Sequence, residues 1–154
     1  MPFALRFEIE GEAELSRRFM KLSEGVKNFA PAFSETEAYM KKTFSRDVFE
    51  TEGGVIGESW KPLTSAYAAR KMKKYPGKGL LEATGTMKNS FATFSNMSSA
   101  AIWNTADYFK YHQSKAARSK LPRRAMMKLD IEQKSVITKI FRSYLTKIQN
   151  GTAI

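Results

Sequence analysis

The sequence has no cysteine and only one histidine among its 154 residues. The absence of cysteine excludes disulfide bonds, thiolate catalysis and cysteine-based zinc sites, and it fits synthesis in a reducing cytosol. One histidine cannot supply a metal site made of several histidines. No apolar run approaches the roughly 18 residues that would predict a membrane span, and the first residues lack the pattern of a secretory signal. We therefore expect a soluble, unprocessed protein without membrane contact.

Length and composition predict a single domain over residues 1–154. At this length about two-thirds of the surface of the unfolded chain becomes buried on folding. Hydrophobic residues make up 42% of the sequence and aromatic residues 12%, which is sufficient for a core. We expect most of the eight methionines and eleven phenylalanines to lie in that core, with Met126 and Met127 as a partly exposed contact.

Acidic residues are scarce in the second half of the chain. Residues 1–60 carry 8 Lys and Arg against 11 Asp and Glu, whereas residues 61–154 carry 18 against 4. The net charge of +11 therefore comes from the second half alone. Such polarity suits either a nucleic-acid surface or head-to-tail contact between copies of the same chain, and charge alone does not separate the two.

The first half predicts one strand followed by two amphipathic helices. Residues 3–9 alternate apolar and charged side chains, which is the period of a half-buried strand. From residue 12 apolar side chains recur every three or four positions, which predicts a helix that ends before Pro31. The run Ser34-Glu35-Thr36-Glu37 is typical of a capping box and predicts the start of a second helix, which ends at Gly53.

The second half predicts a loop, short helices, a hairpin and a final helix. Residues 53–63 form a loop with Trp60 as its buried anchor, and Thr64 caps a helix to about residue 74. Residues 89–95 and 98–104 predict a hairpin, residues 106–113 a short helix, and Asp130 begins a C-terminal helix. The expected fold class is α+β: a small antiparallel sheet (the N-terminal strand plus the central hairpin) packed with amphipathic helices and the C-terminal helix.

No set of residues has the spacing that catalysis needs. His112 is the one imidazole, but its nearest acidic neighbour in the sequence is Asp107, and no serine-rich elbow accompanies them. We interpret His112 as a structural residue that packs beside Tyr108 and Gln113. A hydrolase that uses His112 is the least favoured alternative.

The remaining polar candidates also have structural interpretations. Asp107 is typical of a turn and Asp130 of a helix cap. The stretches 77–79 and 84–86 lack the spacing of a phosphate-binding loop. We therefore expect no enzyme activity, no cofactor and no metal ion.

Four short motifs follow one another between residues 57 and 124. Each combines turn-forming residues with large anchors, as a packed structural part does. In chain order they comprise Gly57, Trp60, Pro62 and Leu63; then Leu81, Thr84, Gly85, Met87 and Ser90; then Tyr108, His112 and Gln113; and finally Pro122 and Arg124.

The order of these motifs resembles the phage virion morphogenesis family, the tail completion proteins of Mu-like phages and prophages. The leading strand followed by a helix is similar to the opening of that family, and the resemblance covers nearly the whole chain. Local departures occur at Ser114, at Arg123 and at residues 126–128. The resemblance implies a small α+β structural protein at the head–tail joint of the virion, as a tail completion, tail terminator or neck subunit. It implies a ring of identical copies, assembled in the bacterial cytoplasm, whose partners are the tail tube and the head connector.

Basic residues that a neighbouring subunit or DNA could contact lie in two groups. They are Arg70, Lys71, Lys73, Lys74, Lys115, Arg118, Lys120, Arg123 and Arg124. We expect residues 114–124 to form a mobile loop that pairs, within a ring, with the acidic set Glu35, Glu37, Glu50 and Glu52 of a neighbour. Genomic DNA in transit is the other partner, bound weakly and in a salt-dependent manner. The main alternative function is a basic nucleic-acid-binding module that uses most of these residues. A solvated helix face stays open as the interpretation of residues 70–74.

Overall fold

The computed structural model describes residues 12–116 and 121–150. Its helices are α1 (Glu12–Lys27), α2 (Ala30–Lys42), α3 (Val48–Glu50), α4 (Ser65–Lys74), α5 (Thr86–Asn89), α6 (Phe109–Gln113) and α7 (Ile131–Gln149), and its strands are β1 (Phe91–Ser95) and β2 (Ala100–Asn104). A π-helical segment, Thr43–Asp47, joins α2 to α3, and Gly54–Ile56 form a 3-10 turn. The strand predicted over residues 3–9 lies outside the described residues.

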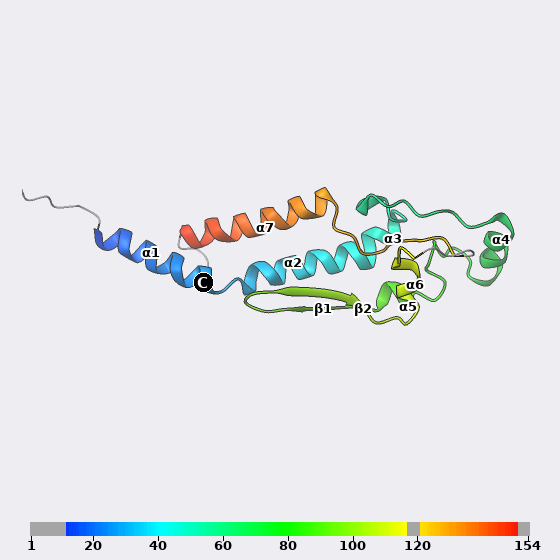
Figure 1. Cartoon of the computed structure of the whole chain (residues 1–154), viewed down its shortest axis with the longest axis horizontal. Helices are drawn as coiled ribbons and strands as arrows, with labels where there is room; N and C mark the ends of the chain where they lie inside the picture. Colours follow the sequence, from blue (N-terminus) through cyan, green and yellow to red (C-terminus); the bar gives the residue numbers. More distant parts are fainter. Residues whose placement is uncertain (1–11, 117–120, 151–154) are drawn as a thin grey trace, which may run out of the picture.

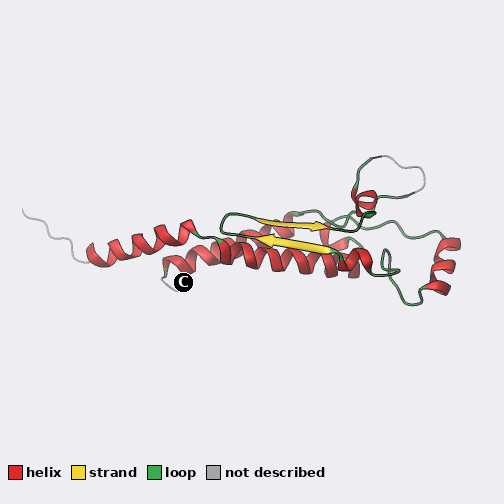
Figure 2. Cartoon of the chain, turned by 90° about the horizontal axis from the view of Figure 1, so that it is seen from below, coloured by secondary structure: helices red, strands yellow, loops and turns green. Residues whose placement is uncertain are grey.

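The described part of the chain is elongated and has three layers (Figure 1). Helix α2 lies in the middle, α7 runs along one side of it in the opposite direction, and the β1–β2 hairpin lies along another side. Helix α1 projects at one end of the molecule and α4 lies at the other end (Figure 2). The two ends of the described molecule are thus α1 and α4, which the three layers leave largely uncovered.

The C-terminal helix begins where the sequence predicts it. The Asp130 carboxylate accepts a hydrogen bond from the backbone of Gln133, whose side-chain oxygen accepts one from the Asp130 amide at 3.0 Å. This capping box satisfies backbone donors that the start of a helix leaves open. The Gln133 side-chain nitrogen also donates to the Val55 carbonyl oxygen at 2.7 Å. Asp130 is therefore a helix cap, as predicted, and its helix is tied to the loop after α3.

The second helix begins earlier than the sequence predicted. Helix α2 starts at Ala30, so the run 34–37 lies inside the helix and forms no capping box. Pro31 is tolerated because a proline in the first helical turn removes a donor that has no helical acceptor. The Asn28 side chain accepts a hydrogen bond from the Ala30 amide at 3.0 Å, which helps to start the helix. The proline that suggested a boundary therefore belongs to the second helix.

The predicted central hairpin is confirmed. Strands β1 and β2 are antiparallel, with Phe91 opposite Asn104 and Ser95 opposite Ala100. The Asn96 side-chain oxygen accepts hydrogen bonds from two backbone amides of the turn, which spans residues 96–99. Together with the surrounding helices, this small antiparallel sheet confirms the α+β class.

The core lies where the end of α2, the loop after α3 and the start of β1 meet. The rings of Phe49 and Trp60 pack edge to face with centroids 5.5 Å apart, and those of Phe91 and Phe109 do so at 5.9 Å. Trp60 is buried, as predicted for an anchor. The buried residues of this cluster are Met40, Phe44, Val48, Phe49, Ile56, Trp60, Leu80, Met87, Phe91 and Met126.

Several large apolar side chains that the sequence analysis assigned to the core are exposed. They are Phe19, Met20, Met72, Phe94 and Met97. Conversely, Met126 is fully buried and is not the partly exposed contact that we predicted. The physical reason is that periodicity identifies an apolar stripe but does not say whether the same chain covers it.

Candidate functional site

The loop that carries Trp60 is fastened to the segment around Arg124. The indole Nε1 of Trp60 donates to the Ala125 carbonyl oxygen at 2.7 Å. The Arg124 guanidinium donates to the Lys61 carbonyl oxygen at 2.9 Å from Nε and at 2.8 Å from Nη2. Arg124 is only 4% exposed. Burial lowers the pKa of its guanidinium. The first and fourth motifs therefore form one internal joint.

Gln113 binds the backbone of the same segment. Its side-chain oxygen accepts hydrogen bonds from the amides of Met126 and Met127 at 3.0 and 3.1 Å. Its side-chain nitrogen donates to the Met127 carbonyl oxygen at 2.6 Å. A glutamine can do this because it offers a donor and an acceptor at one end. The third motif therefore has a structural role at this residue, as predicted.

The first motif starts with glycine for a geometric reason. Gly57 has a left-handed backbone with φ of 65°, a conformation that favours glycine. A Cβ atom at this position would lie 2.4 Å from the Asp130 carboxylate oxygen. Any side chain would therefore collide with the residue that caps α7.

The second motif forms the turns that lead into β1. Gly85 has a φ of 75° and immediately precedes α5, in which Met87 is buried in the core. The Ser90 hydroxyl donates to the Thr86 carbonyl oxygen at 2.6 Å. Leu81 has a φ of 60°, which is uncommon for a residue with a side chain. This motif therefore shapes the backbone between α4 and the hairpin.

Most of the motif residues gather around one groove, which we call the motif groove. Its volume is about 580 Å³. The motif residues in its wall are Pro62, Leu63, Leu81, Thr84, Met87, Tyr108, His112, Pro122 and Arg124, and the rest of the wall is Thr64, Tyr67, Arg70, Lys71, Ala83 and Leu121. Among the described residues, the lining of this groove includes cations but no acidic side chain. The groove therefore favours a polar or anionic occupant.

His112 is half-buried in the wall of the motif groove. Its backbone carbonyl oxygen accepts a hydrogen bond from the Arg124 amide at 3.1 Å, which joins α6 to the fourth motif. Tyr108, one helical turn earlier, is more exposed and lines the same groove. His112 therefore lies near Tyr108 and Gln113 because all three residues lie in or next to one short helix.

Two basic residues that we predicted as partner contacts are internal instead. Besides the buried Arg124, Arg123 forms an ion pair with Glu58 and donates to the Gln113 carbonyl oxygen at 3.2 Å. The prediction of a free basic loop is therefore wrong for these two residues, because Arg124 is hydrogen-bonded to backbone carbonyl groups and Arg123 is paired with Glu58. Lys115 is exposed, and Arg118 and Lys120 lie outside the described residues.

Part of the acidic set that we expected to meet this loop is engaged within the chain. Glu37 accepts a hydrogen bond from the Ser95 hydroxyl, and hydrogen bonds from Ser95 and Thr93 lower the pKa of the Glu37 carboxyl. Glu50 accepts one from the Arg46 guanidinium at 3.0 Å. Glu37 therefore ties the hairpin to α2, and its carboxylate is not free for a neighbour.

The basic cluster of α4 is largely exposed. Arg70, Lys73 and Lys74 are exposed at one end of the molecule (Figure 1). Lys71 differs, because it donates to the Gly79 carbonyl oxygen and burial lowers the pKa of its ammonium group. Three of the four predicted cations are therefore available to a partner.

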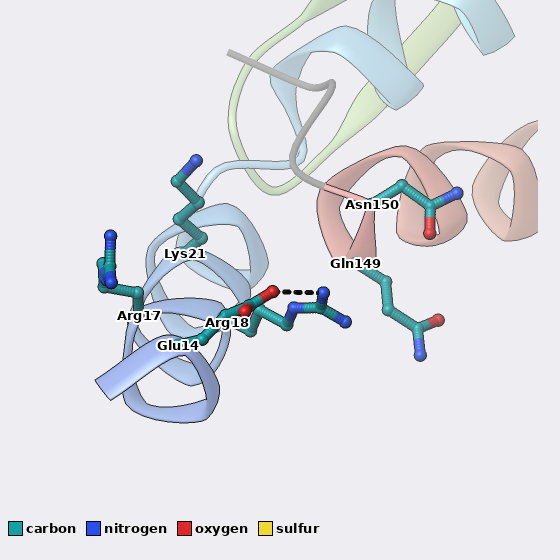
Figure 3. A pocket seen from close by; sticks show the side chains of 6 residues that line it. All are labelled: Glu14, Arg17, Arg18, Lys21, Gln149 and Asn150. Atoms are coloured by element: carbon teal, nitrogen blue, oxygen red, sulfur yellow. Dashed lines mark hydrogen bonds and ion pairs between the residues drawn. The ribbon is translucent and has the colours of Figure 1, made fainter. Parts of the chain in front are cut away.

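A second hollow, which the sequence analysis did not identify, lies between α1 and the end of α7 (Figure 3). Its volume is about 470 Å³. Glu14, Arg17, Arg18 and Lys21 line it from α1, opposite Gln149 and Asn150. The polar face of α1 is thus the face turned toward the end of α7.

Comparison with known proteins found no matching family model, no matching curated protein and no matching solved structure. Within residues 12–116 and 121–150, no helix is long and apolar enough to cross a bilayer. No group of three or more acidic or histidine side chains in that part of the chain could hold a metal ion. The resemblance to the tail completion family therefore depends on the sequence motifs.

Proposed function

We propose that the chain is a structural subunit of a phage particle. It acts at the head–tail joint, as a tail completion, tail terminator or neck protein, in a ring of identical copies. The observation that carries this proposal is the gathering of residues from all four motifs around the motif groove. Residues that do not line the groove, such as Gln113 and Trp60, fasten the segments that form it. Such an arrangement supports a contact surface built from shape and hydrogen bonds.

The chemistry of the motif groove supports a protein partner with acidic groups. The lining of the groove includes the cations Arg70 and Lys71 together with the apolar residues Pro62, Leu63 and Leu121. An extended segment with both apolar and acidic side chains would match this combination. In the proposed joint, that segment belongs to the tail tube or to the head connector.

Genetic complementation tests the proposal. In a phage from which this gene is deleted, we expect DNA-filled heads and unattached tails, because each half assembles without the joint. Purified protein added to such a lysate should restore infectious particles. Joined particles in the deletion lysate would contradict the proposal.

Two tyrosines near α6 provide a matched pair for the groove itself. Tyr108 lines the motif groove, whereas Tyr111 lies outside its wall, and the two are similarly exposed. Tyr108→Glu should abolish complementation, because a carboxylate would repel an acidic partner, whereas Tyr111→Glu should retain it. Equal activity of the two variants would show that the groove is not the contact.

A nucleic-acid-binding module remains the second candidate, and the exposed cations of α4 favour it. Replacing Arg70, Lys73 and Lys74 by Gln should weaken duplex binding and reduce its dependence on salt if this candidate is correct. Size-exclusion mass measured beside the binding assay separates the candidates. A monomer with strong, salt-dependent DNA binding favours the module, and an oligomer with weak binding favours the assembly protein.

A further inference from the structure

We propose that α1 of one copy docks on the outer face of the β1–β2 hairpin of the next copy. The choice of a second copy as the occupant rests on the proposed ring. The proposal itself depends on two exposed apolar surfaces, one at α1 and one on the hairpin, that a single copy cannot bring together.

Helix α1 turns its polar side toward its own chain and its apolar side outward. Glu14, Arg18, Lys21 and Gly25 recur at the spacing of one helix face, and this face meets the end of α7 (Figure 3). A Cβ at Gly25 would lie 2.6 Å from the Ile148 side chain, which shows how closely the two helices approach.

The next face of α1, about 100° around the helix, is the apolar one. Phe19 is 62% exposed and Val26 is 46% exposed. An amphipathic helix normally buries this face. We call these two side chains the arm stripe. Their exposure means that the described chain leaves the apolar face of α1 without a cover.

The hairpin presents a second apolar surface. Because side chains alternate along a strand, Ala92 and Phe94 of β1 share a face with Ala101 and Trp103 of β2. The opposite face carries Phe91, which is buried toward α2. Phe94 is 53% exposed and Trp103 is 45% exposed. We call these four residues the hairpin face.

The surroundings of the hairpin face lack charge. Residues 89–106 contain no Asp, Glu, Lys or Arg, in a chain in which 27% of residues are charged. Natural edge strands usually carry charged residues that prevent pairing with other molecules. The centres of protein interfaces are likewise depleted in charge and enriched in aromatic residues. The hairpin therefore has the composition of a buried contact.

One copy cannot close this contact on itself. The Phe29 amide donates to the Met97 carbonyl oxygen at 3.1 Å, so the end of α1 is fixed beside the hairpin turn. From that point α1 extends away from the hairpin (Figure 2). Its 16 residues span about 24 Å. Folding α1 back would also break its contact with Ile148. Within the described residues, the arm stripe can therefore reach a hairpin face only on another molecule.

The contact is heterologous, because it joins two different surfaces. Every copy then has one arm stripe to give and one hairpin face to receive, and such contacts close into a ring when the rotation allows it. The sizes agree, since Phe19 and Val26 lie about 10 Å apart along the helix and each hairpin strand is about 17 Å long. A ring assembled in this way needs no pairing of opposite charges.

Two variants of the full-length chain test the proposal. The arm variant carries Phe19→Ser and Val26→Ser, and the hairpin variant carries Phe94→Thr and Trp103→Thr, which keeps residues that suit a strand. The matched control carries Met72→Ser on α4 and Tyr111→Ser on α6, two comparably exposed residues outside the wall of the motif groove. Circular dichroism and melting temperature establish that each variant is folded. Sedimentation velocity gives the mass.

We expect the natural chain and the control to be oligomers and each variant alone to be a monomer. A 1:1 mixture of the arm and hairpin variants should form a dimer, because one intact arm and one intact hairpin face remain between them. If the contact instead joined the arm stripes of two copies, mixing would not restore it, because the arm variant has no intact arm stripe. The proposal is overturned if either variant assembles as the natural chain does, if the mixture stays monomeric, or if the natural chain is monomeric at every concentration.

Chemical crosslinking locates the contact directly, because the natural chain has no cysteine. Single variants Phe19→Cys and Ala101→Cys, mixed and treated with a short bismaleimide, should give a covalent heterodimer. Ser135→Cys on α7 should not crosslink to either. Crosslinks formed only between like variants would contradict the proposal. If no such crosslink forms, the proposed contact between α1 and the hairpin is wrong. Complementation of tail-to-head joining still tests the proposed function separately.

Discussion

The indole nitrogen of Trp60 donates a 2.7 Å hydrogen bond to the carbonyl oxygen of Ala125. This bond connects two loops that are far apart in the sequence, and the neighbouring Arg124 reinforces it through the Lys61 carbonyl oxygen. The motif groove lies beside this joint. Its shape therefore depends on a tryptophan that is not itself part of its wall.

Trp60→Ala should lower the free energy of unfolding by about 3 to 5 kcal/mol, because it removes a buried aromatic ring and its hydrogen bond. Trp60→Phe keeps most of the ring and should cost less, since the hydrogen bond to Ala125 contributes about 1 kcal/mol. Urea unfolding measures both. If the melting temperature of Trp60→Ala lies within a degree or two of that of the natural chain, the interpretation of Trp60 as a buried anchor is wrong.

Arg124→Glu should prevent stable folding. The new carboxylate would lie against the carbonyl oxygens of Lys61 and Pro62 in a buried position, and uncompensated buried charge costs about 3 to 5 kcal/mol. Arg70→Glu on the exposed face of α4 is the control for the charge change. The measurement is soluble yield with thermal unfolding. Similar stability of the two variants would show that Arg124 is not a structural joint.

Gly57→Ala should destabilise the chain more than Gly77→Ala. Both glycines have a left-handed φ, 65° and 71°, so both substitutions carry the same backbone cost of about 1 to 2 kcal/mol. Only at Gly57 would the new Cβ collide with Asp130, whereas nothing lies within 4 Å at Gly77. Urea unfolding of the pair isolates the collision. Equal losses of stability in the two variants would mean that Asp130, the cap of α7, can move aside for the new Cβ without cost.

His112→Asn should leave assembly competent, or impair it only through a loss of stability, and should abolish no enzymatic turnover. Its sequence neighbourhood lacks the spacing of a catalytic set, and its backbone carbonyl accepts a hydrogen bond from the Arg124 amide. The purified natural chain and the variant can be screened with esterase, nuclease and peptidase substrates. An activity of the natural chain that disappears in the variant would overturn the structural interpretation.

Local signals in the sequence were sufficient for the hairpin and for α7. The Asp130 cap and the β-rich runs on either side of residue 96 act over a few residues, so neighbouring positions alone specify them. The start of α2 was mispredicted because Pro31 is compatible both with a boundary and with a first helical turn. Local chemistry allows both, and the packing of the chain decides between them.

The candidate site was predictable as a set of residues but not as an arrangement. The motifs named Trp60, Gln113 and Arg124, yet their partners lie on other loops, and the chain supplies no local pattern for such bonds. For the same reason Arg124 was interpreted as a partner contact when it is buried. The exposure of Phe19 could not be read from periodicity, because a stripe looks the same whether or not a neighbour covers it.

Cryo-electron microscopy of complete particles tests the central proposal most directly. The account predicts a closed ring of this chain between the head connector and the tail tube, with a segment of a neighbouring virion protein in the motif groove of each copy. Intact, joined particles in which the ring is absent from that position would contradict it.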